Sequence, residues 1–249
     1  MPRFFCETIA GGKARLTGED AAHVARSLRM GPGEALTLCD GQGTDFFCRI
    51  DYAAPEEVLL TVLESRPSVA EPPVFIRLYM ALPKAEKFEW VVQKSVELGV
   101  GEIVPVLSRR CVSRPDPKSF AKKLQRYNRI AAEAAKQSGR GRIPEVRELL
   151  SFEAAIREMA AHPSPMLFYE QATAPMRETL AAIAGEASVL IGAEGGFDEE
   201  EVAAAAALGI PSLTLGPRIL RCETAPLAAL TAIQYETGGL DTPGKEMSE

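Results

Sequence analysis

The residues beyond Pro73 alternate between short apolar runs and stretches with helical periodicity, and this alternation limits the fold more than any other feature of the chain. Helices are expected over residues 84–99, 118–137, 175–184, 199–208 and 224–235. The runs typical of buried strands are VFIRLYMAL (74–82), EIVPVLS (102–108), MLFYE (166–170), SVLIG (188–192) and SLTLG (212–216). Alternating strands and helices predict an α/β domain whose parallel sheet is covered on both faces. Such sheets bind ligands at the carboxyl ends of their strands.

Residues 1–66 have a different character and predict a small β-rich domain. The segment ALTLCDGQGTDFFCRID (35–51) places Asp-Gly-Gln-Gly between two β-rich runs, which is a hairpin signature. One helix is expected from Glu19 to Met30, ended by Gly31. The proline-containing segment SRPSVAEPP (65–73) predicts a linker, so we expect two domains, at 1–66 and 74–240.

The charge of the chain is unevenly distributed. A net charge of −6 argues against a nucleic-acid partner, yet residues 107–147 contain twelve Lys and Arg against three Asp and Glu. On the helix expected over 118–137, basic residues recur every three or four positions, opposite an apolar face that includes Phe120, Leu124 and Tyr127. A solvated charged face and a surface for a polyanion both explain this pattern; the shortage of acidic residues favours the polyanion.

Other features exclude several protein classes. The N-terminus lacks the apolar stretch of a signal peptide, and no run approaches the roughly 18 apolar residues of a membrane helix, so we expect a cytoplasmic protein without a membrane partner. The five cysteines are scattered and form no C-x-x-C pair, which indicates neither a disulfide framework nor a metal site.

Two glycine-containing turns follow the last two expected strands, LIGAEGG (190–196) and LGPRILRCETAP (215–226). Neither fits a Walker loop or a dinucleotide fingerprint, and tight turns alone would also explain them. The acidic residues of FDEEEV (197–202) are explained in part by a capping box of Asp198 and Glu201, but they would repel a phosphate. S-adenosylmethionine suits such a site, because its sulfonium is positive and it carries no phosphate.

Four segments in order resemble the main motifs of the 16S ribosomal RNA (uridine-N3) methyltransferase family, in the SPOUT superfamily. These are ALPKAEKFEWVVQKSVELGV, AAEAAKQSGR, LIGAEGGFDEEEV and LGPRILRCETAPLAAL, and the N-terminal MPRFF and HVARSLRMGPGE are also similar. The chain departs from the family at Ala193, where proline is usual, and at Cys222 and Pro226, which interrupt the usual Arg-Thr-Glu-Thr-Ala-Ala.

The resemblance implies a PUA-like β-barrel followed by a SPOUT-type parallel sheet with a C-terminal trefoil knot. It also implies a homodimer that uses S-adenosylmethionine to methylate N3 of a uridine in 16S ribosomal RNA or the small ribosomal subunit. The expected catalytic residues are Arg221, Glu223 and Arg140. The expected cofactor-binding residues are Gly192, Glu194, Gly195, Gly196, Leu215, Gly216, Ile219 and Leu220. The expected RNA-binding residues are Arg3, His23, Arg26, Arg29, Lys122, Arg126 and Arg129.

Roles within the catalytic set remain open. Arginine does not readily act as a base, so Glu223 is the better candidate, provided that burial raises its pKa. Cys222 invites a nucleophile hypothesis, but methylation at N3 needs no covalent intermediate, and an inert buried cysteine is commoner. Two alternative functions are an RNA-binding assembly factor that has lost catalysis and a SPOUT methyltransferase that acts on another RNA.

Overall fold

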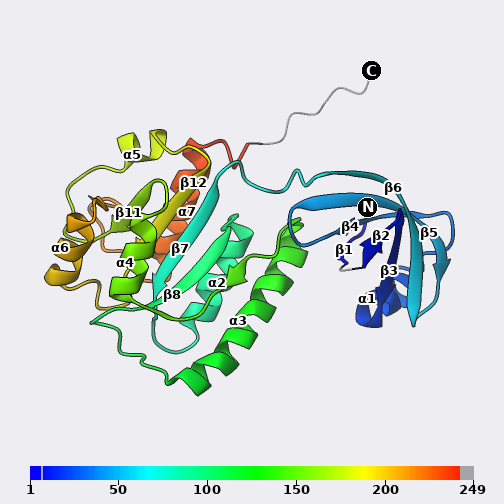
Figure 1. The fold of residues 1–249 in the computed structure, drawn as a ribbon, viewed down its shortest axis with the longest axis horizontal. Helices are drawn as coiled ribbons and strands as arrows, with labels where there is room; N and C mark the ends of the chain where they lie inside the picture. The colour runs from blue at the N-terminus through cyan, green and yellow to red at the C-terminus, as the bar shows by residue number, and fades with distance from the viewer. Residues whose placement is uncertain (7, 242–249) are drawn as a thin grey trace. The chain divides into compact units, whose positions relative to one another are not determined.

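The computed structural model describes residues 1–6 and 8–241, and these form two compact units (Figure 1). The first unit contains Met1–Glu71 and Ala135–Ile143; the second contains Pro72–Ala134 and the residues from Pro144 onward. The first unit therefore extends beyond the predicted boundary at residue 66 and includes a segment that lies about 65 residues further along the chain.

The first unit is built on a six-stranded sheet with the order β1-β4-β5-β6-β3-β2. All pairs are antiparallel except β1 with β4. The predicted hairpin is confirmed: the side chain of Asp40 accepts hydrogen bonds from the backbone N–H groups of Gln42 (2.8 Å) and Thr44 (3.0 Å) in the turn. The strands are β1 (Arg3–Phe5), β2 (Ile9–Ala10), β3 (Lys13–Thr17), β4 (Ala35–Cys39), β5 (Thr44–Ala53) and β6 (Glu57–Pro67).

The helix predicted from Glu19 to Met30 is present, but it ends earlier and is of mixed type. Helix α1 covers only Gly18–Ala22, and the chain continues as a π-helical turn, η1 (His23–Ser27). The wider turn is visible in the hydrogen bond from the Leu28 N–H to the His23 carbonyl, 2.9 Å, across five residues. Apolar spacing in the sequence does not distinguish this wider turn from an ordinary helix.

The predicted linker is shorter than expected because β6 continues to Pro67, where it pairs with Thr44 of β5. The following residues also belong to the first unit: the Ser68 N–H donates to the Gly43 carbonyl at 2.8 Å. The distant segment joins at the same place, since the Gly43 N–H donates to the Gly141 carbonyl at 3.1 Å and the Ile143 N–H to Gly41 at 3.0 Å.

The second unit contains a seven-stranded sheet in which every pair is parallel, as the sequence predicts. The strand order is β10-β8-β7-β12-β11-β13, and β9 pairs with β8. The central strands are buried along almost their whole length, which is typical of a sheet covered on both faces. The strands are β7 (Phe75–Ala81), β8 (Glu102–Leu107), β9 (Glu145–Val146), β10 (Leu150–Ser151), β11 (Pro165–Phe168), β12 (Glu186–Ile191) and β13 (Ser212–Leu213).

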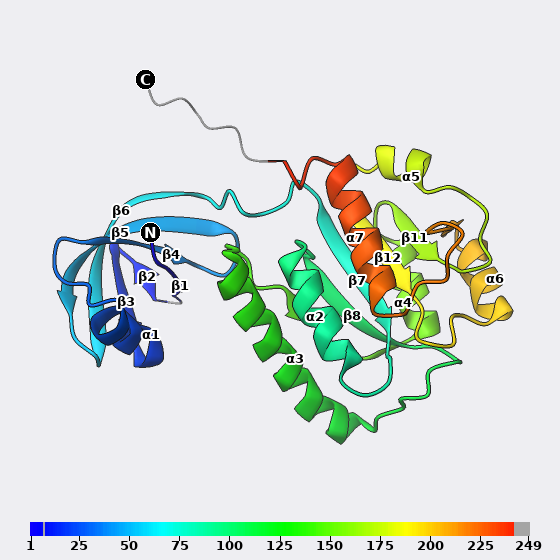
Figure 2. The same cartoon turned by 180° about the vertical axis from the view of Figure 1, so that it is seen from behind.

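Helices cover both faces of this sheet. Figures 1 and 2 show α2 and α7 beside each other on one face and α4 on the other. The long α3 packs on α2 through Tyr127, whose ring lies 4.7 Å from that of Phe88. The helices are α2 (Lys87–Glu97), α3 (Pro117–Ser138), α4 (Phe152–Ala160), α5 (Arg177–Ala181), α6 (Glu199–Ala207) and α7 (Thr224–Glu236).

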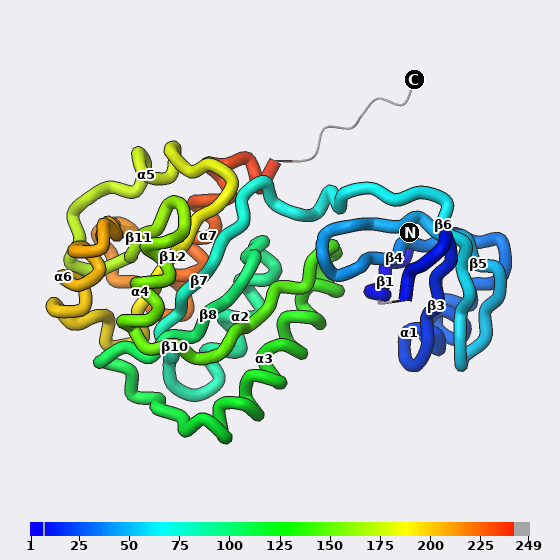
Figure 3. Tube along the Cα trace, in the orientation of Figure 1, coloured from blue at the N-terminus to red at the C-terminus, as the bar shows by residue number. Residues whose placement is uncertain are grey.

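Three elements between β8 and β11 were not predicted: β9, β10 and α4, which Figure 3 shows as a continuous stretch of the trace. The signal for α4 is present in the sequence, because Phe152, Ala155, Ile156 and Met159 are buried at helical spacing. Ser151 caps this helix by accepting a hydrogen bond from the Ala154 N–H at 3.2 Å.

A charged network joins β7, β8 and α4. The hydroxyl of the fully buried Tyr79 donates to Glu158 at 2.8 Å, and the Arg147 guanidinium contacts Glu158 at 2.5 Å and Glu102 at 3.4 Å. Burial raises the pKa of Glu158, but the hydrogen bonds from Arg147 and Tyr79 outweigh it, so the net pKa is lowered. Glu158 is therefore held as a carboxylate.

All five cysteines are buried free thiols. Within residues 1–6 and 8–241, no helix is both long enough and apolar enough to cross a membrane. The same residues contain no cluster of three His, Cys, Asp or Glu side chains that could hold a metal ion.

Candidate functional site

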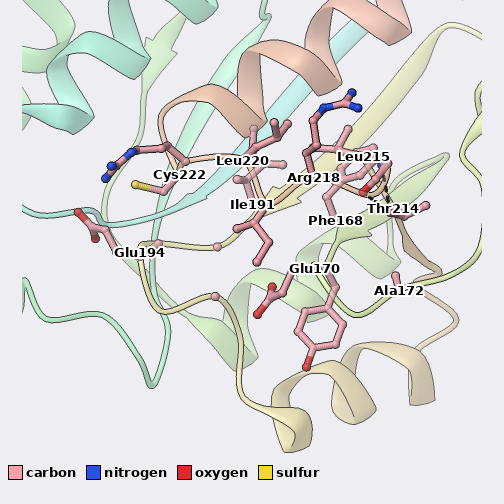
Figure 4. Close-up of a pocket in the computed structure, with 18 of the residues that line it drawn as sticks. Phe168, Glu170, Ala172, Ile191, Glu194, Thr214, Leu215, Arg218, Leu220 and Cys222 are labelled. Atoms are coloured by element: carbon pink, nitrogen blue, oxygen red, sulfur yellow. Dashed lines mark hydrogen bonds between the residues drawn. The ribbon is translucent and has the colours of Figure 1, made fainter.

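A pocket of about 950 Å³ opens at the carboxyl ends of β11, β12 and β13, the edge at which parallel sheets bind ligands (Figure 4). Its walls come from three chain segments, residues 168–173, 191–196 and 214–222. Lys87 of α2 and Ala225 of α7 also line it. The pocket therefore collects residues that lie more than 130 positions apart in the sequence.

The turn after β12 is tight because its glycines lie against other chain segments. The Gly196 N–H donates to the Ala193 carbonyl at 3.0 Å, and Gly196 has a positive φ of 63°. A Cβ on Gly196 would lie 2.5 Å from a carboxylate oxygen of Glu170, and one on Gly192 would lie 3.1 Å from the Gly196 Cα. Ala193 is compatible with this turn although the family usually has proline there.

The segment 214–222 forms the opposite wall. The Thr214 hydroxyl oxygen accepts a hydrogen bond from the Gly216 N–H at 3.1 Å, which fixes the start of the loop. Gly216 has a φ of 97°, and a Cβ on it would meet no protein atom within 4 Å. The side chains of Leu215 and Leu220 line the pocket together with Ile191 (Figure 4). These walls suit a flat apolar group held between loops.

Lys87 links two carboxylates at one end of the pocket. Its ammonium lies 3.2 Å from Glu194 and 3.3 Å from Glu223. A hydrogen bond from the Cys222 thiol, followed by contact with Lys87, lowers the pKa of Glu223. Burial raises the pKa of Glu194, but hydrogen bonds from backbone N–H groups and Lys87 outweigh it and lower the net value. Both groups are carboxylates at neutral pH.

Glu223 does not meet the condition that was set for a general base. The sequence hypothesis required burial to raise its pKa, whereas contact with Cys222 and Lys87 lowers it. The surroundings of Cys222 disfavour a nucleophilic thiolate, because burial, followed by the hydrogen bond to Glu223, raises the pKa of the thiol to about 12.

The acidic start of α6 is used within the protein. Asp198 accepts a hydrogen bond from the Glu200 N–H at 3.1 Å, and Glu201 accepts one from the Asp198 N–H at 2.9 Å, which confirms the capping box. Arg109 pairs with Glu200 at 2.5 Å. These acidic residues are therefore bound to the helix terminus and to the loop after β8, and none of them lines the pocket.

Glu170 is the carboxylate that faces the pocket without a partner. It is exposed and lies at the centre of the close-up in Figure 4. Among the residues that the structure describes, none forms a side-chain hydrogen bond or ion pair with Glu170. Because Gly196 has no Cβ, there is room for the Glu170 carboxylate beside it. A carboxylate in this setting attracts hydroxyl or cationic groups of a ligand.

The structure brings most of the predicted site together. Arg221 lines the pocket, and Glu223 lies next to it through Lys87. The predicted cofactor-binding residues also line the pocket: Gly192, Glu194, Gly195, Gly196, Leu215, Gly216, Ile219 and Leu220.

Arg140 is an exception, because it is not among the residues that line the pocket. Its side chain is only 4% exposed and contacts Glu71 at 2.7 Å. Glu71 also accepts hydrogen bonds from the N–H groups of Gly141 and Arg142, both at 2.9 Å. Arg140 therefore helps to attach residues 135–143 to the rest of the first unit, and it does not line the pocket of its own chain.

The predicted RNA contacts lie in two groups. Lys122, Arg126 and Arg129 are exposed on α3, although Arg126 contacts Glu89 at 2.6 Å and Arg129 lies 3.8 Å from Glu133. In the first unit the exposed residues are His23, Arg26 and Arg29.

Arg3 differs from the rest of its group, because it contacts the buried Asp45 at 2.5 Å and the Ser68 hydroxyl at 2.8 Å. Its guanidinium is thus used within the protein, and an RNA contact by Arg3 stays a prediction.

The sequence reasoning missed Lys87, Glu170 and Arg218, all of which line the pocket. Lys87 lies inside one of the motif segments, ALPKAEKFEW, so its place in the motif was an available signal. Glu170 follows β11 at the ligand edge of the sheet, and a search of strand ends for charged residues would have found it.

Comparisons with known proteins agree with this architecture. The chain matches the RNA methyltransferase domain family over residues 70–234 and the RNA methyltransferase PUA domain family over residues 16–63. It is 34% identical to the ribosomal RNA small subunit methyltransferase E of Bacillus subtilis, covering 89% of this chain and 90% of the relative.

Solved structures are similar over nearly the whole chain. The ribosomal RNA small subunit methyltransferase E of Neisseria gonorrhoeae, bound to S-adenosylmethionine, has a TM-score of 0.80 and 31% identity and covers 94% of this chain and 97% of its own. A methyltransferase from Legionella pneumophila with bound S-adenosylmethionine has a TM-score of 0.79 and 33% identity, with 94% and 96% covered.

The matches confirm the expected fold class, a PUA-like domain followed by a SPOUT-type parallel-sheet domain, while the trefoil knot stays a prediction. Both parts of the chain match domains of RNA methyltransferases, in the same order. The chain therefore belongs to the ribosomal RNA small subunit methyltransferase E family.

Proposed function

We propose that this chain transfers the methyl group of S-adenosylmethionine to N3 of a uridine in 16S ribosomal RNA. The observation that carries the proposal is the pocket between the turn after β12 and the loop 214–222, in a chain whose relatives were solved with this cofactor. The glycines of both walls let backbone groups approach a ligand closely.

The residues present suit this cofactor. Apolar side chains of Ile191, Leu215 and Leu220 can hold the adenine, and Glu170 offers a carboxylate to the ribose hydroxyls or to the positive charge of the methionine part. The unpaired carboxylate of Glu170 would attract a sulfonium and disfavour a phosphate placed beside it. When bound, the cofactor supplies an electrophilic methyl group, and the protein has to align the acceptor with it.

Arg221 and Glu223 are proposed to orient the uracil. Arg221 is exposed at the pocket and can donate hydrogen bonds to the carbonyl oxygens that flank N3. Glu223 is a carboxylate and can accept the N3–H, which fixes the ring and assists proton loss. Its lowered pKa limits its strength as a base, so alignment is the larger contribution.

The exposed basic residues of α3 are proposed to contact RNA phosphates. Lys122, Arg126 and Arg129 lie on the solvent face of the helix, opposite the buried Phe120 and Tyr127. His23, Arg26 and Arg29 of the PUA-like unit form a second exposed basic group. Phosphate contacts of this kind give affinity that falls as salt concentration rises.

A homodimer in the cytoplasm remains part of the proposal, on the family resemblance. Light scattering should give about twice the chain mass of 26.8 kDa. A value near 26.8 kDa at working concentration would contradict the dimer without affecting the proposed reaction.

Nucleoside mass spectrometry tests the reaction. Ribosomal RNA from cells that lack the protein should lose N3-methyluridine, and purified protein with S-adenosylmethionine should restore it. Assays on naked 16S RNA and on assembled small subunits from those cells would identify the substrate. Unchanged N3-methyluridine in the cells would refute the proposal and favour an assembly factor or a methyltransferase of another RNA.

A further inference from the structure

We infer that Lys87 is a positioning residue that holds together the two chain segments between which the cofactor binds. The inference rests on the proposed function, since it takes S-adenosylmethionine as the ligand of the pocket. Lys87 lies in a motif segment, but the motif assigns it no role; its role follows from the contacts of its ammonium group.

The geometry places Lys87 between the two walls. It is the first residue of α2, and its ammonium contacts Glu194, in the turn after β12, at 3.2 Å. It contacts Glu223, at the end of the opposite loop, at 3.3 Å. The backbone N–H of Lys84 also donates to both carboxylate oxygens of Glu194, at 3.1 and 3.3 Å. The start of α2 therefore holds both walls at once.

The charges explain why this position requires a cation. Glu194 and Glu223 come from different segments and meet at one ammonium, with the Cys222 Sγ 3.9 Å from it. Without the ammonium, two carboxylates would face each other at the pocket edge, and their repulsion would separate the walls. The side chains of the three charged residues are only 25–32% exposed, so water screens this repulsion incompletely.

The pKa values support this reading. The hydrogen bond to Glu194, followed by the one to Glu223, raises the pKa of Lys87. The groups that face Lys87 from the packed elements are Glu194, Cys222 and Glu223, and the pKa values of both carboxyls are lowered. Lys87, Glu194 and Glu223 therefore all remain ionised at neutral pH, and the bridge is intact there.

Calorimetry with S-adenosylmethionine and S-adenosylhomocysteine tests the role of Lys87. Loss of positioning should weaken both ligands about tenfold in Lys87→Met, because the walls no longer face each other. Lys87→Arg keeps the charge and should stay within about threefold of the wild type. A matched control is Lys94→Met on the same helix, which should bind as the wild type does. Among the residues that the structure describes, the Lys94 ammonium pairs with its neighbour Glu97, at 2.8 Å, and it does not line the pocket.

The comparison of the two ligands separates positioning from simple charge balance. If Lys87 only balanced charge, Lys87→Met would bind the cationic S-adenosylmethionine at least as tightly as the wild type and would leave S-adenosylhomocysteine unaffected. That result would overturn the inference. Failure of the wild type to bind either ligand would instead refute the proposed function.

A pH series and a double-mutant cycle give readouts that a purely structural lysine would not change. In the wild type, affinity for S-adenosylhomocysteine should fall as pH drops below 4.5, the ordinary glutamate pKa, because protonation of Glu194 and Glu223 breaks the bridge. Lys87→Met should not show this loss. The effects of Lys87→Met and Glu194→Gln should be less than additive; full additivity would count against the bridge.

Discussion

Gly216 and Gly209 provide a matched pair of substitutions that separates ligand contact from backbone strain. Both glycines have positive φ, 97° and 79°, and a Cβ on either would meet no protein atom within 4 Å. Gly216 lines the pocket, whereas Gly209 follows α6 and does not. An alanine at either position must adopt a backbone conformation that L-residues avoid, at a cost of about 1–2 kcal/mol.

The expected result is equal destabilisation with unequal binding. Each variant should unfold several degrees below the wild type, at about 2–4 °C per kcal/mol for a protein of this size. Gly209→Ala should bind S-adenosylmethionine as the wild type does. Gly216→Ala should bind at least tenfold more weakly, about 1.4 kcal/mol, because the methyl group takes up space at the pocket wall.

Differential scanning calorimetry measures the first quantity and titration calorimetry the second. Wild-type affinity in both variants would refute the reasoning, because it would show that the ligand does not approach Gly216. Equal weakening in both would indicate that strain alone reduces binding. Gly195 is unsuitable for this test, since a Cβ there would lie 2.9 Å from the Cβ of Arg110 and would disturb the protein itself.

Three further predictions follow from other parts of the structure. Replacing Lys122 and Arg129 with glutamate should weaken RNA binding in a filter-binding series. The slope of log affinity against log salt concentration should become smaller by roughly 0.7–0.9 for each lost phosphate contact, and cofactor affinity should not change. Cys222→Ala should retain methyl transfer at pH 7.5 within a few-fold, because a thiol with a pKa of about 12 is no nucleophile; complete loss would revive that hypothesis. Arg147→Met should destabilise the fold by about 1–3 kcal/mol in urea. Since the folded-state pKa of Glu158 is lowered, the contribution of the pair should be present at neutral pH and fade as pH falls below 4.5.

The parallel sheet and the pocket were predictable from the sequence because both depend on local patterns. Apolar runs separated by helices specify parallel strands, and the glycines after the last two long runs mark the ligand edge. The residues from Gly192 to Leu220 named for the cofactor line one pocket for this reason. The amphipathic character of α3 was predictable in the same way, from the spacing of Phe120 and Tyr127.

Pairings between distant residues were not predictable. Arg140 follows the basic helix, and its positive charge would suit a phosphate. Glu71, 69 positions away, instead holds it in a buried ion pair. Arg3 likewise forms an ion pair with the distant Asp45. A single sequence shows that a charge exists and does not show which opposite charge the fold brings to it. The positions of lone cations therefore could not be inferred from the sequence, whereas the positions of residues that belong to a pattern could.

The same limit applies to Glu223, and it bears on how the proposed reaction removes a proton. The residue was identified by its motif, but its pKa depends on Cys222 and on Lys87 of α2. Cys222 stands where the family motif usually has threonine. Contacts that hold a carboxylate in place by stabilising its charged form also weaken it as a base. A uridine that enters the pocket and takes the Cys222 contact away from Glu223, with the Lys87 bridge kept, would raise the pKa of that carboxyl when the N3–H reaches it. Base strength in this site would then arise from substrate binding, and the free protein would keep Glu223 ionised and aligned.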